Sequence, residues 1–251
     1  LNAAVEICDG KVEGGYLGSQ QVSFIPECVN AGEYQFAIGS AGSTTLVFQT
    51  VLLPLLFAAS QSVVRFEGGT HNGMSPSYDF MHSCFLPVLN KMNYRVETDF
   101  EAYGFYPAGG GAWRATFTPV AATQSIELNS PKEIESFRAV ATSARIPGHV
   151  TERELSCVVK EQTCFTGRLQ QNLVQSCGPG NILSLRMASA DVTEVFEVLG
   201  ERGLSAEKVA HQALFLMQKH RESGAVVGEY LADQLLLPRV LGSGRPLIHI
   251  H

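Results

Sequence analysis

Hydrophobic and polar positions follow two different periods along the first half of the chain. Runs of period two predict short strands, and apolar residues three or four apart predict helices. Between residues 34 and 119 the pattern gives a strand, a helix, a strand, a helix and two strands. Their ranges are 34–37, 43–58, 62–69, 78–92, 94–100 and 113–119. This β-α-β-α-β-β order predicts one layered unit whose helices bury one face of its sheet.

The same unit recurs in part on both sides of this segment. The opening residues predict a helix followed by the strands "KVEGG" and "QVSFIP", which is the order that ends such a unit. The strands "SIELNS" and "SFRAVATSA" are expected to open a third copy. Because each unit has a single apolar face, the repetition predicts that the units stack on one another.

The pattern changes between residues 146 and 223. This segment predicts the helix "VTERELSCVVKEQ", a turn at "GPG", the strands "NILSLRMAS" and "TEVFEVLG", and a helix over 205–220 that Ser205 caps. We therefore expect an α/β (α+β) fold in three parts. Residues 1–145 form a repeat domain, 146–223 an inserted smaller α/β domain, and 224–251 return to the repeat domain.

The segment "GEYLADQLLLP", residues 228–238, combines two faces of a helix. Val227, Leu231 and Leu235 recur every four positions and predict a face turned to a core. The neighbouring stripe is polar and consists of Glu229, Tyr230, Asp233 and Gln234. Two carboxylates, a phenol and an amide on one stripe of a buried helix indicate a ligand site as well as a core position.

Composition excludes a membrane span and indicates a reducing compartment. With 251 residues, 45% hydrophobic and 17% charged, the chain can bury a sizeable core. Its longest apolar stretch, 45–60, contains Gln49 and Pro54 and is shorter than the roughly 20 residues that span a bilayer. The six cysteines form no C-x-x-C pair and no secretory signal precedes them, so we expect free thiols and a cytoplasmic protein rather than a zinc site.

The charge balance limits the possible nucleic-acid partners. The formal net charge is −6, and the lysines and arginines are dispersed along the chain. Non-specific affinity for nucleic acid depends on neutralising many phosphates, so the chain is not expected to coat a DNA duplex. Binding of a single phosphate or of one strand end stays compatible with this composition.

Two features of the stretch "FAIGSAGSTTLVFQT" could serve a ligand. Gly39 to Ser43 lie directly before a helix, where free N–H groups favour an anion, although a tight turn with Ser43 as N-cap explains the same residues. Gln49 lies inside the apolar run that follows. A buried amide without partners costs about 1–3 kcal/mol, so we expect a ligand or a facing strand to supply them. Because Gln49 and the polar stripe of 228–238 are both polar positions on otherwise apolar helices, we also expect them to converge in space.

Other stretches allow both a structural and a chemical interpretation. "GGTHNGMSPSYDF" is either a long connection or a ligand loop in which His71 is a base or a metal ligand. "GFYPAGGG" fits a bulged hairpin or a close approach of backbone to ligand. His249 and His251 alternate on one face of a strand, which suits a metal only with a third ligand that the sequence does not indicate.

Taken in order, five motifs resemble the RNA 3′-terminal phosphate cyclase family, in its bacterial form. They are "FAIGSAGSTTLVFQT", "GGT" followed by Pro76 and Asp79, "GFYPAGGG", "GPGN" and "VGEYLADQLLLP", and they span essentially the whole chain. The resemblance implies stacked βαβαββ repeats similar to the C-terminal domain of translation initiation factor 3. It also implies a small domain inserted in the third repeat, in agreement with the pattern above.

The resemblance implies an ATP-dependent enzyme that converts an RNA 3′-phosphate end into a 2′,3′-cyclic phosphate through enzyme–AMP and RNA–adenylate intermediates. Its partners would be ATP, the RNA 3′-phosphate end and a divalent cation (Mg or Mn). By the same resemblance, Gln49 contacts the nucleotide, Pro76 lies against the adenine, and a segment of the polar helix binds the nucleotide. That segment is Tyr230, Leu231, Ala232, Asp233 and Gln234.

Two family features are not matched within these residues. The family's glycine- and glutamate-containing loop is expected before Leu1, and its nucleophilic histidine a few residues beyond His251, so we expect a truncated chain that does not cyclise RNA by itself. The alternative is a non-catalytic cyclase-like ribosome-assembly factor, which would typically have lost nucleotide residues of the kind "GEYLADQ" retains. An enolpyruvyl transferase, built from related repeats, is disfavoured because its basic substrate clamps are not evident.

Overall fold

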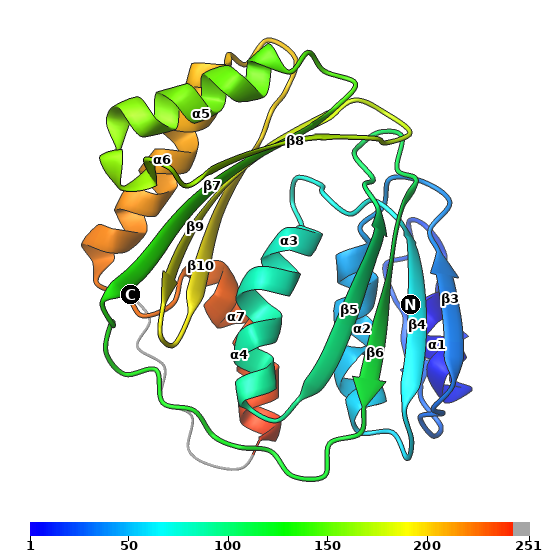
Figure 1. Cartoon of the computed structure of the whole chain (residues 1–251). Coiled ribbons are helices and arrows are strands. Elements are labelled where there is room, and N and C mark those ends of the chain that lie inside the picture. Colours follow the sequence, from blue (N-terminus) through cyan, green and yellow to red (C-terminus); the bar gives the residue numbers. More distant parts are fainter. Residues whose placement is uncertain (243–251) are drawn as a thin grey trace.

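The computed structural model describes residues 1–242 (Figure 1). The helices are α1 (Asn2–Cys8), α2 (Thr44–Leu56), α3 (Tyr78–Phe80), α4 (Leu86–Lys91), α5 (His149–Glu161), α6 (Ala206–Ser223) and α7 (Glu229–Leu241), with a π-helical turn η1 (Met81–Phe85) and a 3-10 turn η2 (Thr163–Phe165). The strands are β1 (Lys11–Glu13), β2 (Ser23–Ile25), β3 (Glu33–Ala37), β4 (Ser62–Gly68), β5 (Arg95–Ala102), β6 (Gly111–Thr118), β7 (Ile134–Ala144), β8 (Leu169–Val174), β9 (Gly180–Ser189) and β10 (Thr193–Leu199). These elements confirm a mixed α/β fold.

The first large sheet has the strand order β3-β4-β6-β5. β3 and β4 are parallel, and the other neighbours are antiparallel. Along β4, Val64 and Phe66 are fully buried and alternate with half-buried charged residues, so one face of the sheet carries the core. Helix α2 and the continuous helix α3–η1–α4 cover that face (Figure 1). The predicted β-α-β-α-β-β unit is therefore confirmed.

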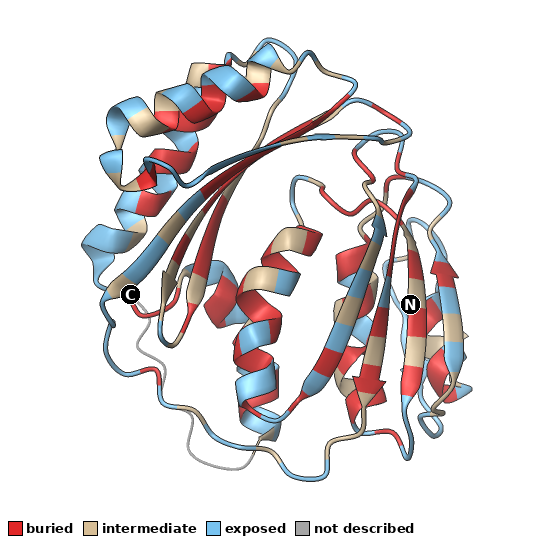
Figure 2. Cartoon of the chain, in the orientation of Figure 1, coloured by how far each residue is buried: buried red, intermediate tan, exposed pale blue. Residues whose placement is uncertain are grey.

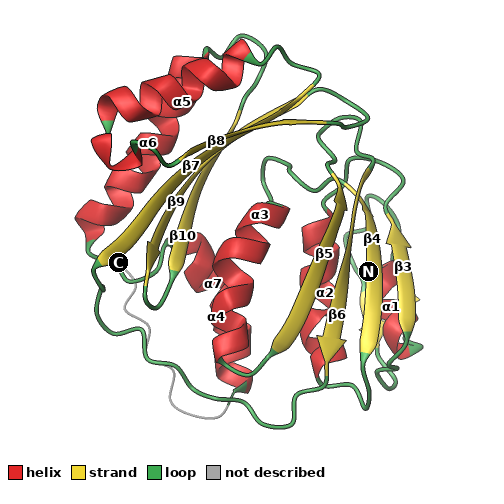
Figure 3. Ribbon diagram, in the orientation of Figure 1, coloured by secondary structure: helices red, strands yellow, loops and turns green. Residues whose placement is uncertain are grey.

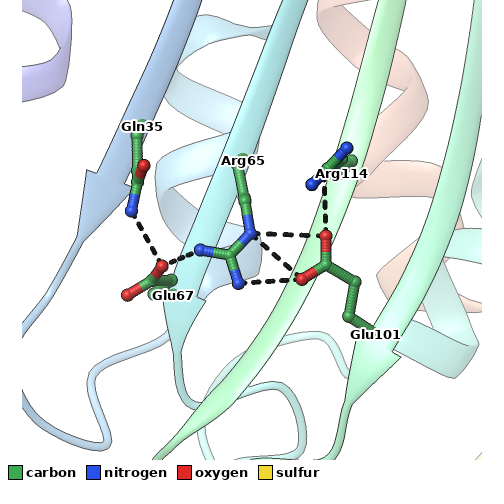
Figure 4. Close-up of polar contacts among 5 residues, drawn as sticks. All are labelled: Gln35, Arg65, Glu67, Glu101 and Arg114. Atoms are coloured by element: carbon green, nitrogen blue, oxygen red, sulfur yellow. Dashed lines mark hydrogen bonds and ion pairs between the residues drawn. The ribbon is translucent and has the colours of Figure 1, made fainter.

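The opposite face of this sheet carries a charged network (Figure 4). Arg65 and Arg114 are directly opposite each other in the register of β4 and β6, which by itself is repulsive. Glu101 lies between them, 2.8 Å from Arg65 Nη2 and 2.8 Å from Arg114 Nε. Arg65 also pairs with Glu67, which accepts a hydrogen bond from Gln35. Opposite charges thus offset the like-charge pair on the solvent side of the sheet.

The second large sheet has the order β10-β9-β7-β8, with β7 parallel to β8 and antiparallel to β9. Helices α5 and α6 cover the face turned away from the first sheet (Figure 3). Between these helices and the second sheet lies a separate apolar core that includes Ala139, Ala141, Leu183, Leu185 and Met217.

The segment "SFRAVATSA", expected to open a third repeat, forms most of β7 and is hydrogen-bonded to β8 and β9. The sheet of the smaller unit therefore begins at Ile134, before the expected boundary at 146. The division into 1–145, 146–223 and 224–251 stays a prediction. The pattern did not indicate β8, half of whose residues are polar and most of which are exposed.

The two sheets pack through the helix α3–η1–α4, which lies between them (Figure 1). Val192 and Val195 near β10 belong to the large core around α2, α4 and β4. A smaller apolar cluster of Phe105, Ala144 and Ile182 joins the sheets at their other end. Figure 2 shows buried positions along the strands of both sheets and along the helices that cover them. Among residues 1–242, no helix is long and apolar enough to cross a membrane.

Candidate functional site

Helix α2 brings together three segments that are far apart in the sequence. Its N-cap is Ser43, whose side chain accepts a hydrogen bond from Leu46 N. Thr45 Oγ1 donates to the Pro76 carbonyl at 2.6 Å. One turn later, Gln49 Nε2 donates to Gln234 Oε1 of α7. The expectation that Gln49 and the polar helix meet is confirmed. Thr45, which binds the Pro76 carbonyl, lies one turn of α2 before Gln49.

Helix α7 has the two faces that its sequence predicts. Leu231 and Leu235 are fully buried in the large core, and Ala232 is also buried. We define the α7 stripe as Tyr230, Asp233 and Gln234. Tyr230 is 68% exposed, Asp233 is exposed and Gln234 is half-buried. The stripe therefore presents a phenol, a carboxylate and an amide beside α2, while Leu231 and Ala232 hold the helix in the core.

Two contacts outside the expected residues fix α7 at its ends. Near its C-terminus, Tyr94 Oη donates to the Pro238 carbonyl at 2.8 Å. At its N-terminus, Glu194 Oε1 accepts from Gly228 N at 2.7 Å. Burial raises the pKa of Glu194 to about 7, and the hydrogen bond from Gly228 opposes this shift. One signal in the sequence could have found Glu194. It lies two residues before Phe196 on β10 and so shares a sheet face with this residue of the second core.

His71 belongs to the core rather than to an open site. It is only 1% exposed, and its Nδ1 lies 2.8 Å from Thr70 Oγ1. Its Nε2 is 3.8 Å from Asp79 Oδ2, and Asp79 is 3.2 Å from Arg186 Nη2 on β9. Burial acts to raise the pKa of Asp79, but the neighbouring His71 and the charge of Arg186 lower it below the ordinary value. The loop "GGTHN" thus links the two sheets, which supports its structural interpretation.

The glycine loops meet at one end of the first sheet and pack backbone to backbone. Gly69 N donates to Gly42 O at 2.8 Å, and Thr44 N donates to Gly69 O at 2.9 Å. A Cβ on Gly109, which has a φ of +66°, would lie 2.6 Å from Ser40 O. Glycine is needed at these positions for close approach of backbone to backbone.

The same contacts bear on the anion site considered for the loop before α2. Gly42 N donates to Ser40 Oγ, and the N–H groups of Thr44 and Leu46 also have partners within the protein. A helix N-terminus attracts an anion through its unpaired N–H groups. The geometry therefore favours the tight turn capped by Ser43.

A family model for RNA 3′-terminal phosphate cyclase matches residues 1–251. The chain belongs to this family. It is 44% identical over 245 residues to the RNA 3′-terminal phosphate cyclase of Ectopseudomonas mendocina (strain ymp), a match that covers 97% of this chain and 72% of the relative. It is 44% identical over 244 residues to that of Salmonella agona (strain SL483), covering 96% and 70% of the two chains.

The residues that the resemblance implies for the nucleotide lie close together around α2. The motif residues that the resemblance implies for the nucleotide lie on α7, on α2 and in the loop before α3, and the hydrogen bonds above connect all three. In the part of the chain that the structure describes, no three His, Cys, Asp or Glu side chains gather as they would around a metal ion. His249 and His251, considered as metal ligands, lie outside the described residues.

Proposed function

We propose that this chain binds ATP beside the α2–α7 contact and takes part in converting an RNA 3′-terminal phosphate into a 2′,3′-cyclic phosphate. The observation that carries the proposal is the meeting of Gln49 and Gln234 in a chain of the cyclase family. These two amides hydrogen-bond each other at the edge of the core. They can replace that hydrogen bond by hydrogen bonds to a nucleotide at little cost, since neither amide is then left unpaired.

The implied site residues then divide by what they can offer. Gln49 and Gln234 supply amide donors and acceptors, and exposed Tyr230 offers an aromatic face on which an adenine can stack. Half-buried Pro76 adds an apolar surface that Thr45 holds against α2. Leu231 and Ala232 act through their core packing, which fixes the α7 stripe.

The chemistry that we propose proceeds by activating the terminal phosphate. A histidine nitrogen attacks the α-phosphorus of ATP, forming an N–P bond and releasing pyrophosphate. A phosphate oxygen of the RNA end then takes the AMP group from the histidine and forms a P–O–P anhydride. The neighbouring 2′-oxygen attacks the RNA phosphorus, AMP leaves, and the 2′,3′-cyclic phosphate closes. A phosphate dianion resists attack, whereas its anhydride beside a positioned hydroxyl has both a leaving group and proximity.

A divalent cation, Mg or Mn, is part of the same proposal. Mg²⁺ at such sites is held largely by substrate phosphates and water, with only one or two carboxylates from protein. Asp233 is the exposed carboxylate of the α7 stripe and can contribute in this way. When bound, the cation would offset negative charge on the ATP phosphates.

The test combines nucleotide binding with product analysis. Calorimetry should show ATP binding to the 251-residue chain, and Gln49→Ala should weaken it about tenfold, while the exposed Gln218→Ala on α6 leaves it unchanged. The chain, and a version extended at both ends with residues of the relative from Ectopseudomonas mendocina, are then incubated with ATP, MgCl₂ and an RNA bearing a 3′-phosphate. A cyclic end formed by the extended version supports the proposal. ATP binding by neither version would contradict it and favour a non-catalytic assembly factor.

A further inference from the structure

Helix α7 begins without a side-chain cap of its own. Its N-cap residue is Gly228, which has no side chain to offer. The first N–H groups of a helix lack partners within the helix, and its N-terminus carries a partial positive charge. The group that reaches this end comes from Glu194 on β10, whose Oε1 accepts from Gly228 N at 2.7 Å. A strand of the second sheet therefore caps the helix that carries the α7 stripe.

The space around this contact is closely fitted. Glu194 is only 5% exposed. A Cβ placed on Gly228 would lie 2.9 Å from Glu194 Oε2 and 3.7 Å from His220 Nδ1. The φ of Gly228 is −71°, a value open to any residue. The carboxylate, rather than the backbone conformation, therefore accounts for a glycine at this position.

A carboxylate at so buried a position costs free energy unless it is hydrogen-bonded or paired with an opposite charge. Glu194 lines a cavity of about 180 Å³ between β9, the end of α6 and the segment 224–226 that leads to α7. The titratable and charged groups around it are Lys132 before β7, His220 and Arg221 on α6, Glu229 on α7 and Cys84 in η1. Glu194 is paired with none of these through a hydrogen bond or ion pair described for residues 1–242; its described partner is the backbone of Gly228.

We propose that Glu194 is a positioning residue for the nucleotide site. By holding the N–H at the start of α7, it sets the place of the α7 stripe beside Gln49, and it makes nucleotide affinity depend on the second sheet. This inference rests on the proposed function, because it concerns the same nucleotide. It adds a residue on β10 that lies outside all five family motifs.

The test measures ATP affinity by calorimetry on the full 251-residue chain at pH 8. Glu194→Ala is expected to weaken ATP binding about fivefold to tenfold, as the loss of one helix cap would. Glu194→Gln keeps an oxygen that can accept from Gly228 N, so its affinity should stay within about threefold of wild type. Glu201→Gln, an exposed carboxylate after β10, is the matched control and should change nothing.

A second variant, Gly228→Ala, tests the same contact from the helix side with Glu194 left in place. Gly228→Ala adds the methyl group that would crowd the carboxylate, and it should weaken ATP binding in the wild-type background. In a Glu194→Gly background, where the carboxylate is gone, the same substitution should weaken binding no further. Equal effects of Gly228→Ala in the two backgrounds would overturn the inference.

Hydrogen exchange separates failure of this inference from failure of the proposed function. Glu194→Ala should speed amide exchange in the peptide over 228–233, and Glu194→Gln should not. Faster exchange with unchanged ATP affinity would overturn the positioning role and leave the nucleotide site intact. If wild type binds no ATP at all, the proposed function itself fails, and the positioning role fails with it.

Discussion

Replacing Glu154 by glutamine should make the protein more stable at alkaline pH. Glu154 on α5 is fully buried, Asn181 Nδ2 donates to its Oε2 at 3.2 Å, and its Oε1 has no hydrogen-bond partner among the described residues. Burial raises its pKa to about 7, and the hydrogen bond from Asn181 only partly opposes this. The side chain is therefore protonated in the folded state at pH 5 and increasingly ionised above pH 7.

The direction in which pH changes the free energy of unfolding follows from the raised pKa of Glu154. The folded protein binds this proton more tightly than the unfolded chain does, so the stabilisation is fully present below the unfolded pKa and is lost as pH rises through the folded one. With an unfolded pKa of 4.5 and a folded pKa of about 7, the group costs about 3 kcal/mol at pH 8 and about 1 kcal/mol at pH 5. Glutamine does not titrate, so the difference between variant and wild type should change by about 2 kcal/mol over this range.

The assay is urea unfolding of wild type and Glu154→Gln at pH 5, 6, 7 and 8, followed by circular dichroism. Every other titrating group is common to both proteins and cancels in the difference. Glu152→Gln, an exposed carboxylate on the same helix, should change stability by only a few tenths of a kcal/mol at every pH. Parallel pH profiles for wild type and Glu154→Gln would refute the reasoning.

Three further substitutions test a contact of α7, a glycine turn and the cap of α6. Tyr94→Phe removes the hydroxyl that donates to the Pro238 carbonyl and should lower the free energy of unfolding by about 1 kcal/mol in guanidinium titrations; no loss would show that water replaces this bond. Gly109→Ala forces a side chain into a φ of +66° at 2.6 Å from Ser40 O, so a fall in melting temperature of several degrees is expected and an unchanged value would contradict the contact. Ser205→Ala removes the cap of α6 and should cost about 1 kcal/mol by thermal unfolding, whereas Ser205→Asp should retain stability.

The sequence predicted the element order of the first sheet because its helices and strands bury one face each. In β4, for example, Val64 and Phe66 alternate with charged residues, and the period is clear. It also predicted the meeting of Gln49 with α7, because both are polar positions on otherwise apolar helices. The same reasoning placed Ser43 and Ser205 correctly as helix caps.

What the sequence did not predict depends on pairing between distant strands. Nothing local in "SFRAVATSA" shows that it joins β8 and β9 rather than a third repeat, since pairing partners are set by tertiary packing. The exposed residues of β8 carry no hydrophobic period to detect. Glu194 was missed for a related reason, because its partner is a backbone N–H that no side-chain motif reveals.

The most direct test of the nucleotide site is photolabelling with 8-azido-ATP followed by mapping of the modified peptides. The account predicts label on α7 within 228–238 and on α2 within 44–56, suppressed by excess ATP and reduced by Gln49→Ala. Saturable labelling confined to the second sheet and helices α5 and α6, with none on α2 or α7, would contradict it.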